Sequence, residues 1–199
     1  MIRTQDIEAE FNTQLKRISD LSIREKVIET WCKASQEGGW KSIEELRELP
    51  FTVVTDPQGI SLLQHTKAAT EGALALAKIQ METISAFPYV DLDILMAGAL
   101  LHDINKVVTF ERDEKNSFRK KEGPSVNAPA FPGLKIARET GLPDDIIGVI
   151  EYECRKAVGN PPNVEAILIH HADMTTFDTM IFFNREERSC KDIHTDSRS

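Results

Sequence analysis

Cysteine is scarce in this sequence, and the three cysteines present argue against two kinds of structural site. Cys32, Cys154 and Cys190 lie far apart and form no Cys-x-x-Cys motif. An odd number of isolated cysteines predicts neither a disulfide framework nor a zinc site built from thiolates. We therefore expect reduced thiols in a cytoplasmic protein.

Long apolar runs and an excess of positive charge are also absent. No stretch approaches the roughly 20 apolar residues that a membrane-spanning helix needs, and residues 1–6 lack the apolar core of a secretory signal. The formal net charge of −8 argues against sequence-independent binding to nucleic acid, which depends on contacts of Lys and Arg with phosphates. We expect neither a membrane nor a nucleic acid polymer as a partner.

The composition and the helical spacing of apolar residues predict an all-α globular protein. A hydrophobic share of 41% in 199 residues is enough for one compact domain with a substantial core. We expect an N-terminal helical extension over residues 1–55, a main helical domain over 56–185 and a polar tail over 186–199. Residues 51–55 are predicted as an extended linker and 105–128 as a polar segment. The predicted helices cover residues 5–19, 23–36, 42–48, about 60–84, the stretch that Asp91 opens, Pro132 to Gly141, Pro143 to the break at Gly159, and 163–184.

An imidazole and a carboxylate follow the most apolar stretch of the chain. Residues 94–101 are all apolar or small and predict a buried helix, and His102 and Asp103 come directly after it. A carboxylate near a helix C-terminus opposes the helix dipole by ~0.3–1 kcal/mol. Its burial costs more unless a cation or hydrogen bonds satisfy it. A bound metal ion would compensate for both the unfavourable helix dipole and the burial of the carboxylate.

Two other predicted helices also carry a metal-binding group on an apolar face. His65 shares a helical face with small and apolar residues from Ala68 to Ile79. Asp173 lies on an apolar stripe of the last predicted helix, and buried aspartates are almost never left unpaired. Two imidazoles and two carboxylates suit a divalent first-row metal ion with open coordination positions.

Each of these residues also has a structural interpretation. A single histidine on an apolar face is more often a hydrogen-bonded core residue than a ligand. Asp103 could cap a neighbouring helix or pair with Lys106, and Asp173 could pair with a buried arginine. For His171, ring stacking or a core hydrogen bond is favoured over metal ligation, and His194 is expected to be solvated in the tail.

Taken together, these residues resemble the HD-domain superfamily of metal-dependent phosphohydrolases over roughly residues 60–185. The anchors are His65, the pair His102-Asp103 within Leu-His-Asp-Ile-Asn-Lys, close to the family's HDxxK form, and Asp173 within Ile-His-His-Ala-Asp-Met. The family fold is an all-α bundle, which agrees with the helix pattern. The resemblance implies that these four residues are the metal ligands.

The resemblance also implies roles for neighbouring residues. Lys106 corresponds to a family lysine that commonly contacts an anionic substrate. The metal would lower the pKa of a bound water, and Asp103 would orient or deprotonate that water while also binding the metal. His170, one turn before Asp173, is a candidate substrate contact, outer ligand-supporting group or general acid, with a structural role as the alternative.

One departure from the family pattern indicates a single metal ion. Family members with two metals place further histidines between the HD pair and the last Asp, but residues 104–169 contain none. Pro129 stands where a member often has a histidine, four residues before Gly133. Mn, Fe, Co, Ni and Zn all suit His and Asp ligands. The basic residues 119–121 could contact a phosphate, although a charged run in a loop is usually only solvated.

The predicted function is therefore a hydrolase that uses a metal-activated water on a small anionic substrate, by default a phosphomonoester or a nucleotide. Two alternatives remain open. The same fold could open a ring or cleave a non-phosphate bond, since fold does not fix function and the chain lacks a Gly-rich phosphate loop. A non-catalytic regulatory module could also retain the metal site. The N-terminal helices either pack on the bundle or form the contact of a homodimer.

Overall fold

The computed structural model describes residues 1–121, 131–155 and 159–195, with side chains as far as residue 184. Within these ranges the chain forms ten α-helices and one two-stranded hairpin, so the predicted all-α fold is confirmed. None of the described helices is long and apolar enough to cross a membrane. The elements are α1 (Thr4–Glu10), α2 (Asn12–Leu15), α3 (Leu21–Gly38), α4 (Ile43–Glu48), α5 (Leu62–Thr83), α6 (Leu92–Leu101), α7 (Ile104–Thr109), β1 (Phe110–Arg112), β2 (Phe118–Lys120), α8 (Pro132–Glu139), α9 (Asp144–Cys154) and α10 (Val164–Thr195).

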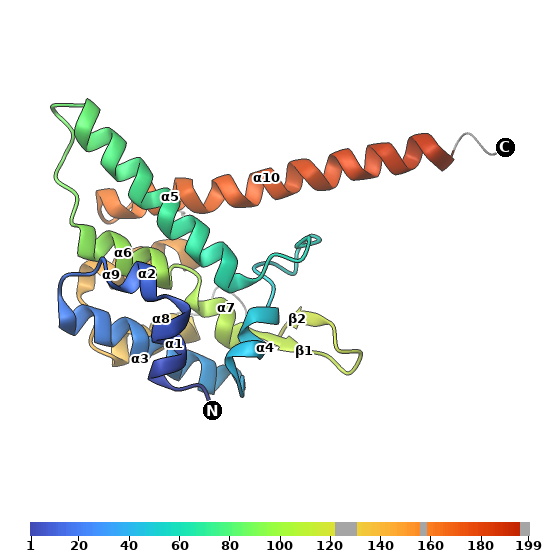
Figure 1. Ribbon diagram of the computed structural model, residues 1–199, viewed down its shortest axis with the longest axis horizontal. Helices are drawn as coiled ribbons and strands as arrows, with labels where there is room; N and C mark the ends of the chain where they lie inside the picture. The colour runs from blue at the N-terminus through green and yellow to red at the C-terminus, as the bar shows by residue number, and fades with distance from the viewer. Residues whose placement is uncertain (122–130, 156–158, 196–199) are drawn as a thin grey trace.

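Helix α6 lies at the centre of the bundle. Its residues 95–101 are all buried, as the apolar sequence predicts. It packs against α2, α3, α5, α9 and α10, so helices from both ends of the chain cover it. In Figure 1, α5 and the first part of α10 lie above α6, and the rest of α10 extends away from the body of the protein. Any polar group at the end of α6 is therefore held deep between helices.

Local sequence determines where α5 and α6 begin. Ser61 and Gln64 form a capping box, in which each side chain bonds the backbone of the other residue. The Asp91 side chain accepts hydrogen bonds from two backbone N–H groups in the first turn of α6. Helix α6 ends at Leu101 with His102 as its C-cap, and Asp103 is the N-cap of α7. The predicted HD pair thus occupies the junction between two helices.

The N-terminal helices share one hydrophobic core with the rest of the chain. The Trp31 indole donates a hydrogen bond to the Leu100 carbonyl at 3.0 Å, and the Trp40 indole donates to the Val107 carbonyl at 2.7 Å. These bonds attach α3 and the turn after it to α6 and α7, on either side of the helix junction. The N-terminal helices therefore pack on the bundle, while the homodimer contact and the domain division at residue 55 stay predictions.

The predicted helix over residues 5–19 is interrupted. It forms α1 and α2 with Phe11 between them, at φ −109° and ψ 21°. The Phe11 ring is fully buried and packs against Trp31 with ring centroids 5.0 Å apart. The amphipathic pattern alone predicts one helix here. The structure has two short helices, and the break between them lies at the residue whose ring is buried in the common core.

The predicted polar segment 105–128 contains more structure than expected. It begins with α7 and continues into the antiparallel hairpin of β1 and β2, where Phe110 pairs with Lys120. Asn116 adopts a left-handed conformation (φ 61°) in the turn, and Arg119 pairs with Glu111 across the strands at 2.9 Å. The sequence does not predict these strands, because charged residues dominate this part of it. Residues 122–128 and Pro129 lie outside the described residues.

The chain also differs from prediction at its last helix. Helix α10 continues to Thr195, eleven residues beyond the predicted end at 184. The side chains of Cys190 and His194 lie outside the described part of the structure. Residues 51–55 form no strand, as predicted, and Phe51 at the start of the predicted linker is fully buried.

Helix α8 starts directly against the backbone of α7. The Gly133 N–H donates to the side-chain oxygen of Asn105 at 3.1 Å. A Cβ atom on Gly133 would lie 2.6 Å from the Asn105 Cα and N atoms, closer than real Cβ atoms come to backbone. Glycine is therefore required here, and the contact fixes the first turn of α7, which follows the HD pair.

We predict that Gly133→Ala lowers the free energy of unfolding by about 1–3 kcal/mol, because the added methyl group must displace backbone in a packed contact. Thermal or denaturant unfolding measures this change. Lys135→Ala on the exposed side of the same helix is the control and should change stability by no more than about 0.5 kcal/mol. Equal stability of the two variants would show that the helices do not meet as closely as described.

Candidate metal centre

Four metal-binding groups from separate elements meet at one point. His65 lies in the first turns of α5 and Asp173 on α10, while His102 and Asp103 connect α6 to α7 as their cap residues. One donor atom from each residue lies within 4.8 Å of the corresponding atoms of the others. Both imidazoles are fully buried, whereas the side chains of Asp103 and Asp173 are 14% and 18% exposed. The four residues that the sequence predicts as ligands are therefore brought together at an accessible edge.

The distances among these groups leave little space between them. His65 Nε2 lies 2.8 Å from Asp173 Oδ1 and 3.3 Å from Asp103 Oδ2. His102 Nε2 lies 3.4 Å from Asp103 Oδ2 and 3.4 Å from His65 Nε2. The same nitrogen of each imidazole thus faces the same two carboxylates. The partner of Asp173 is this histidine pair and not a buried arginine.

The surroundings of the two imidazoles set their orientation. His102 Nδ1 lies 2.7 Å from the Ala99 carbonyl, which accepts a hydrogen bond from an N–H but offers none. The Nδ1 atom therefore carries a proton, and Nε2 is the atom available to a metal. His65 is held by the Phe51 ring, stacked on it at 4.8 Å. Its buried Nδ1 has no hydrogen-bond partner among the described residues.

Opposite charges outweigh burial in this cluster. Burial would lower the pKa of His102, but Asp103 and Asp173 hold it well above the usual value. Burial would raise the pKa of Asp103, but Lys106 and His102 hold it well below the usual range. Hydrogen bonds from His102 and His65 likewise outweigh burial and lower the pKa of Asp173. Without a metal, the centre thus keeps two carboxylates ionised around a protonated imidazole.

The donor set fits a divalent metal ion. Two imidazole nitrogens and two carboxylate oxygens are the ligands that first-row transition metals accept. The negative charge of the carboxylates favours a cation, which would take the place of the proton between them. The chemistry of the residues therefore supports a metal centre but does not determine which metal it binds.

Lys106 lies beside the cluster. Its Nζ is 2.6 Å from Asp103 Oδ2 and 5.9 Å from the centroid of the Phe51 ring. The pairing of Asp103 with Lys106, one structural alternative from the sequence, thus occurs together with the cluster. Asp103 also stands at the N-cap position of α7, the other alternative, but its side chain makes no capping hydrogen bond there.

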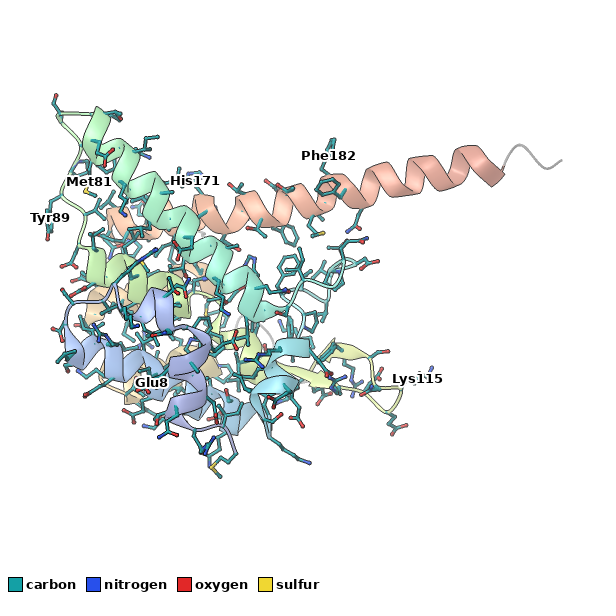
Figure 2. All side chains as sticks on the ribbon, in the orientation of Figure 1. Glu8, Met81, Tyr89, Lys115, His171 and Phe182 are labelled. Atoms are coloured by element: carbon teal, nitrogen blue, oxygen red, sulfur yellow. The ribbon has the colours of Figure 1, made fainter. Side chains whose placement is uncertain are left out.

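The remaining predicted residues lie outside the four-residue cluster. His170 Nδ1 lies 3.3 Å from Glu153 Oε1. His171, labelled in Figure 2, is exposed on α10, and its ring meets the His170 ring edge-on with centroids 5.6 Å apart. The predicted ring stacking is therefore replaced by an edge contact, and the predicted core hydrogen bond is wrong because the side chain is exposed. In the basic run 119–121, Arg119 pairs with Glu111 and Lys121 donates to backbone carbonyls.

The sequence reasoning missed two groups near the cluster. Phe51 comes from a loop, and no local pattern predicts that it covers His65. The Glu153 side chain is only 7% exposed on α9. A signal for it does exist, since Ile146, Val149, Ile150 and Glu153 follow the i, i+3, i+4, i+7 spacing of one helical face.

Comparison with known proteins covers the same part of the chain. The family model described as HD domain matches residues 62–178, which contain all four residues of the cluster. The dihydroneopterin 2′,3′-cyclic phosphate phosphodiesterase of Methanocaldococcus jannaschii is 26% identical over 162 residues. The match covers 79% of this chain and 64% of that protein, less than two thirds of its length. No solved structure gives a significant match.

We predict that Asp173→Asn weakens metal binding by more than about 100-fold, because the variant loses a charged ligand and not only a supporting hydrogen bond. Titration of the metal-free protein with Mn²⁺ in a calorimeter measures the affinity. Asp178→Asn, at an exposed position on the same helix, is the matched control and should bind as the wild type does. Wild-type affinity in Asp173→Asn would remove this residue from the site.

Metal affinity should also rise with pH. The pKa of His102 is raised in the metal-free centre, so a metal ion must displace its proton. That displacement becomes easier as the pH approaches the raised pKa from below. Calorimetry at pH 6, 7 and 8 should show tighter binding at each step, together with proton release that depends on buffer ionisation. Affinity that is independent of pH would contradict a protonated centre.

Proposed function

This chain belongs to the HD domain family, and from that premise we propose that it is a metal-dependent hydrolase that cleaves a phosphoester bond in a small anionic molecule. The observation that carries the proposal is the convergence of His65, His102, Asp103 and Asp173 within 4.8 Å. We propose one divalent first-row ion as the cofactor, since no further histidine lies between residues 104 and 169. A single cluster of this kind occurs among the described residues.

The residues around the cluster are proposed to have different roles in the reaction. A divalent ion in the site would supply a bound water of lowered pKa and would polarise the phosphoryl group. Asp103 lies at the partly exposed edge, where it can orient the attacking water and accept its proton. Lys106 is a flexible cation within reach of Asp103, and a phosphate oxygen can replace the carboxylate as its partner. His170 is the candidate proton donor or substrate contact.

Two observations support the proposed class of substrate. The sequence predicts a phosphomonoester or a nucleotide, whereas the relative from Methanocaldococcus jannaschii is named for a cyclic phosphodiester. We therefore include small phosphodiesters with phosphomonoesters in the proposed class. Hydrolysis of a non-phosphate bond and a purely regulatory role are the alternatives that the following experiment separates from it.

We predict that the metal-loaded protein hydrolyses at least one compound in a panel of bis(4-nitrophenyl) phosphate, 4-nitrophenyl phosphate, 2′,3′-cyclic AMP and nucleoside monophosphates. Mn²⁺, Fe²⁺, Co²⁺, Ni²⁺ and Zn²⁺ are supplied in turn, and activity should be lost with a chelator. Protein that holds stoichiometric metal and hydrolyses none of these compounds would contradict the proposal and favour the alternatives.

In the same assay, Lys106→Met should lower kcat/KM by about 10–100-fold, because a charged hydrogen bond to a phosphate contributes about 1.5–3 kcal/mol. Lys115→Met is the control, since this lysine lies at the exposed tip of the hairpin (Figure 2). An unchanged kcat/KM in Lys106→Met would exclude this lysine from substrate binding.

A further inference from the structure

A buried carboxyl group outside the metal cluster lacks a hydrogen bond on one oxygen. Glu153 Oε1 on α9 is enclosed by protein and has no hydrogen-bond partner within the described ranges. His170 Nδ1 on α10 is likewise buried and unpartnered, and it lies only 3.3 Å from that oxygen. Two buried polar atoms that face each other in this way are costly to leave unbonded. A small rotation of either side chain would join them in a hydrogen bond.

The His170 ring has one buried edge and one accessible part. Its side chain is 27% exposed although Nδ1 is enclosed, so the exposed surface belongs to other atoms of the side chain. Tyr152 contacts the ring edge-to-face, with centroids 6.1 Å apart, and His171 contacts it at 5.6 Å. These neighbours, together with Glu153, restrain the ring, and part of the side chain remains exposed to solvent.

The pair of Glu153 and His170 lies next to the metal cluster. His170 precedes Asp173 by three residues, which places both on one face of α10. Burial raises the pKa of Glu153 to about 7, and the carboxylates of Asp173 and Asp103 add to this effect. The positive charges of His102 and Lys106 oppose it. The buried carboxyl therefore lies within electrostatic range of the cluster.

We propose that Glu153 is a positioning residue that holds His170 by Nδ1, so that His170 Nε2 donates a proton to the leaving oxygen of the substrate. This inference rests on the proposed phosphoester hydrolysis. In the reaction, a bond forms between phosphorus and the oxygen of water, and the bond from phosphorus to the leaving oxygen breaks. The water proton passes to Asp103 and the His170 proton passes to the leaving oxygen. Exchange with solvent then restores both residues.

The nature of the leaving group provides the test. A 4-nitrophenolate ion leaves without protonation near neutral pH, whereas the ribose oxygen released from a 2′,3′-cyclic nucleotide needs a proton. Loss of a general acid costs about 10²–10⁴-fold in rate where the proton is needed. A variant that disturbs only the positioning of His170 should therefore slow the second substrate selectively. A merely structural defect should slow both substrates by the same factor.

The experiment compares Glu153→Gln with Glu151→Gln in the metal-loaded protein. Glu151 lies on the same helix, is partly exposed and pairs with Arg138 and Arg155, so it serves as the matched control. Glu153→Gln should lower kcat for 2′,3′-cyclic AMP by about 10–100-fold and leave kcat for bis(4-nitrophenyl) phosphate nearly unchanged. Glu151→Gln should affect neither substrate. His170→Gln should also slow hydrolysis of 2′,3′-cyclic AMP selectively. The double variant of Glu153 and His170 should be no slower on this substrate than His170→Gln alone.

A second readout does not depend on activity. In the metal-free protein, the ¹⁵N signals of the His170 ring should shift in Glu153→Gln and stay in place in Glu151→Gln. Equal loss on both substrates, no loss on either, or unshifted ring signals would overturn the inference while the proposed hydrolysis stands. Cleavage of only the nitrophenyl ester by the wild type would also overturn the inference and leave the proposed hydrolysis in place. Hydrolysis of phosphomonoesters but of neither diester would likewise overturn the inference while the proposed function stands. Failure of the wild type on the whole panel would instead overturn the proposed function, and the inference with it.

Discussion

The balance of charge at the end of α6 is the constraint on which the site depends. A fully buried imidazole and two nearly buried carboxylates, on His102, Asp103 and Asp173, occupy the space between helices α5, α6 and α10. Removal of such charges from water is costly unless opposite charges and hydrogen bonds compensate for it. A proton on His102 supplies that compensation in the metal-free protein, and a divalent cation would supply more of it. Close packing of the helices at this junction is therefore stabilised by positive charge between the carboxylates.

The rest of the fold holds that junction in place. The indoles of Trp31 and Trp40 bond backbone carbonyls of α6 and α7, and Gly133 lets α8 approach the first turn of α7. The buried Phe51 ring stacks on His65. Each contact restrains an element that carries a polar group of the site. The partly exposed carboxylates and Lys106 remain at the edge where a small anion can approach.

Much of this arrangement could be predicted from the sequence because polar groups on apolar helical faces are conspicuous. His65 and Asp173 each interrupt such a face, and the HD pair follows the most apolar stretch of the chain. The contact of Glu153 with His170 depends on how α9 packs against α10, which helical spacing alone does not determine. Phe51 reaches the site from a loop, and the hairpin after α7 is concealed by charged residues. Phe11 interrupts a helix because its ring is buried in the common core, an effect of tertiary packing.

We propose that one metal ion binds between His65, His102, Asp103 and Asp173. Anomalous diffraction from crystals of the protein loaded with Mn²⁺ or Zn²⁺ would locate such an ion. We expect one strong peak per chain, about 2.0–2.2 Å from a nitrogen or oxygen atom of each of the four residues. Two peaks in the site, or a peak bound by other residues with these four left unligated, would contradict it.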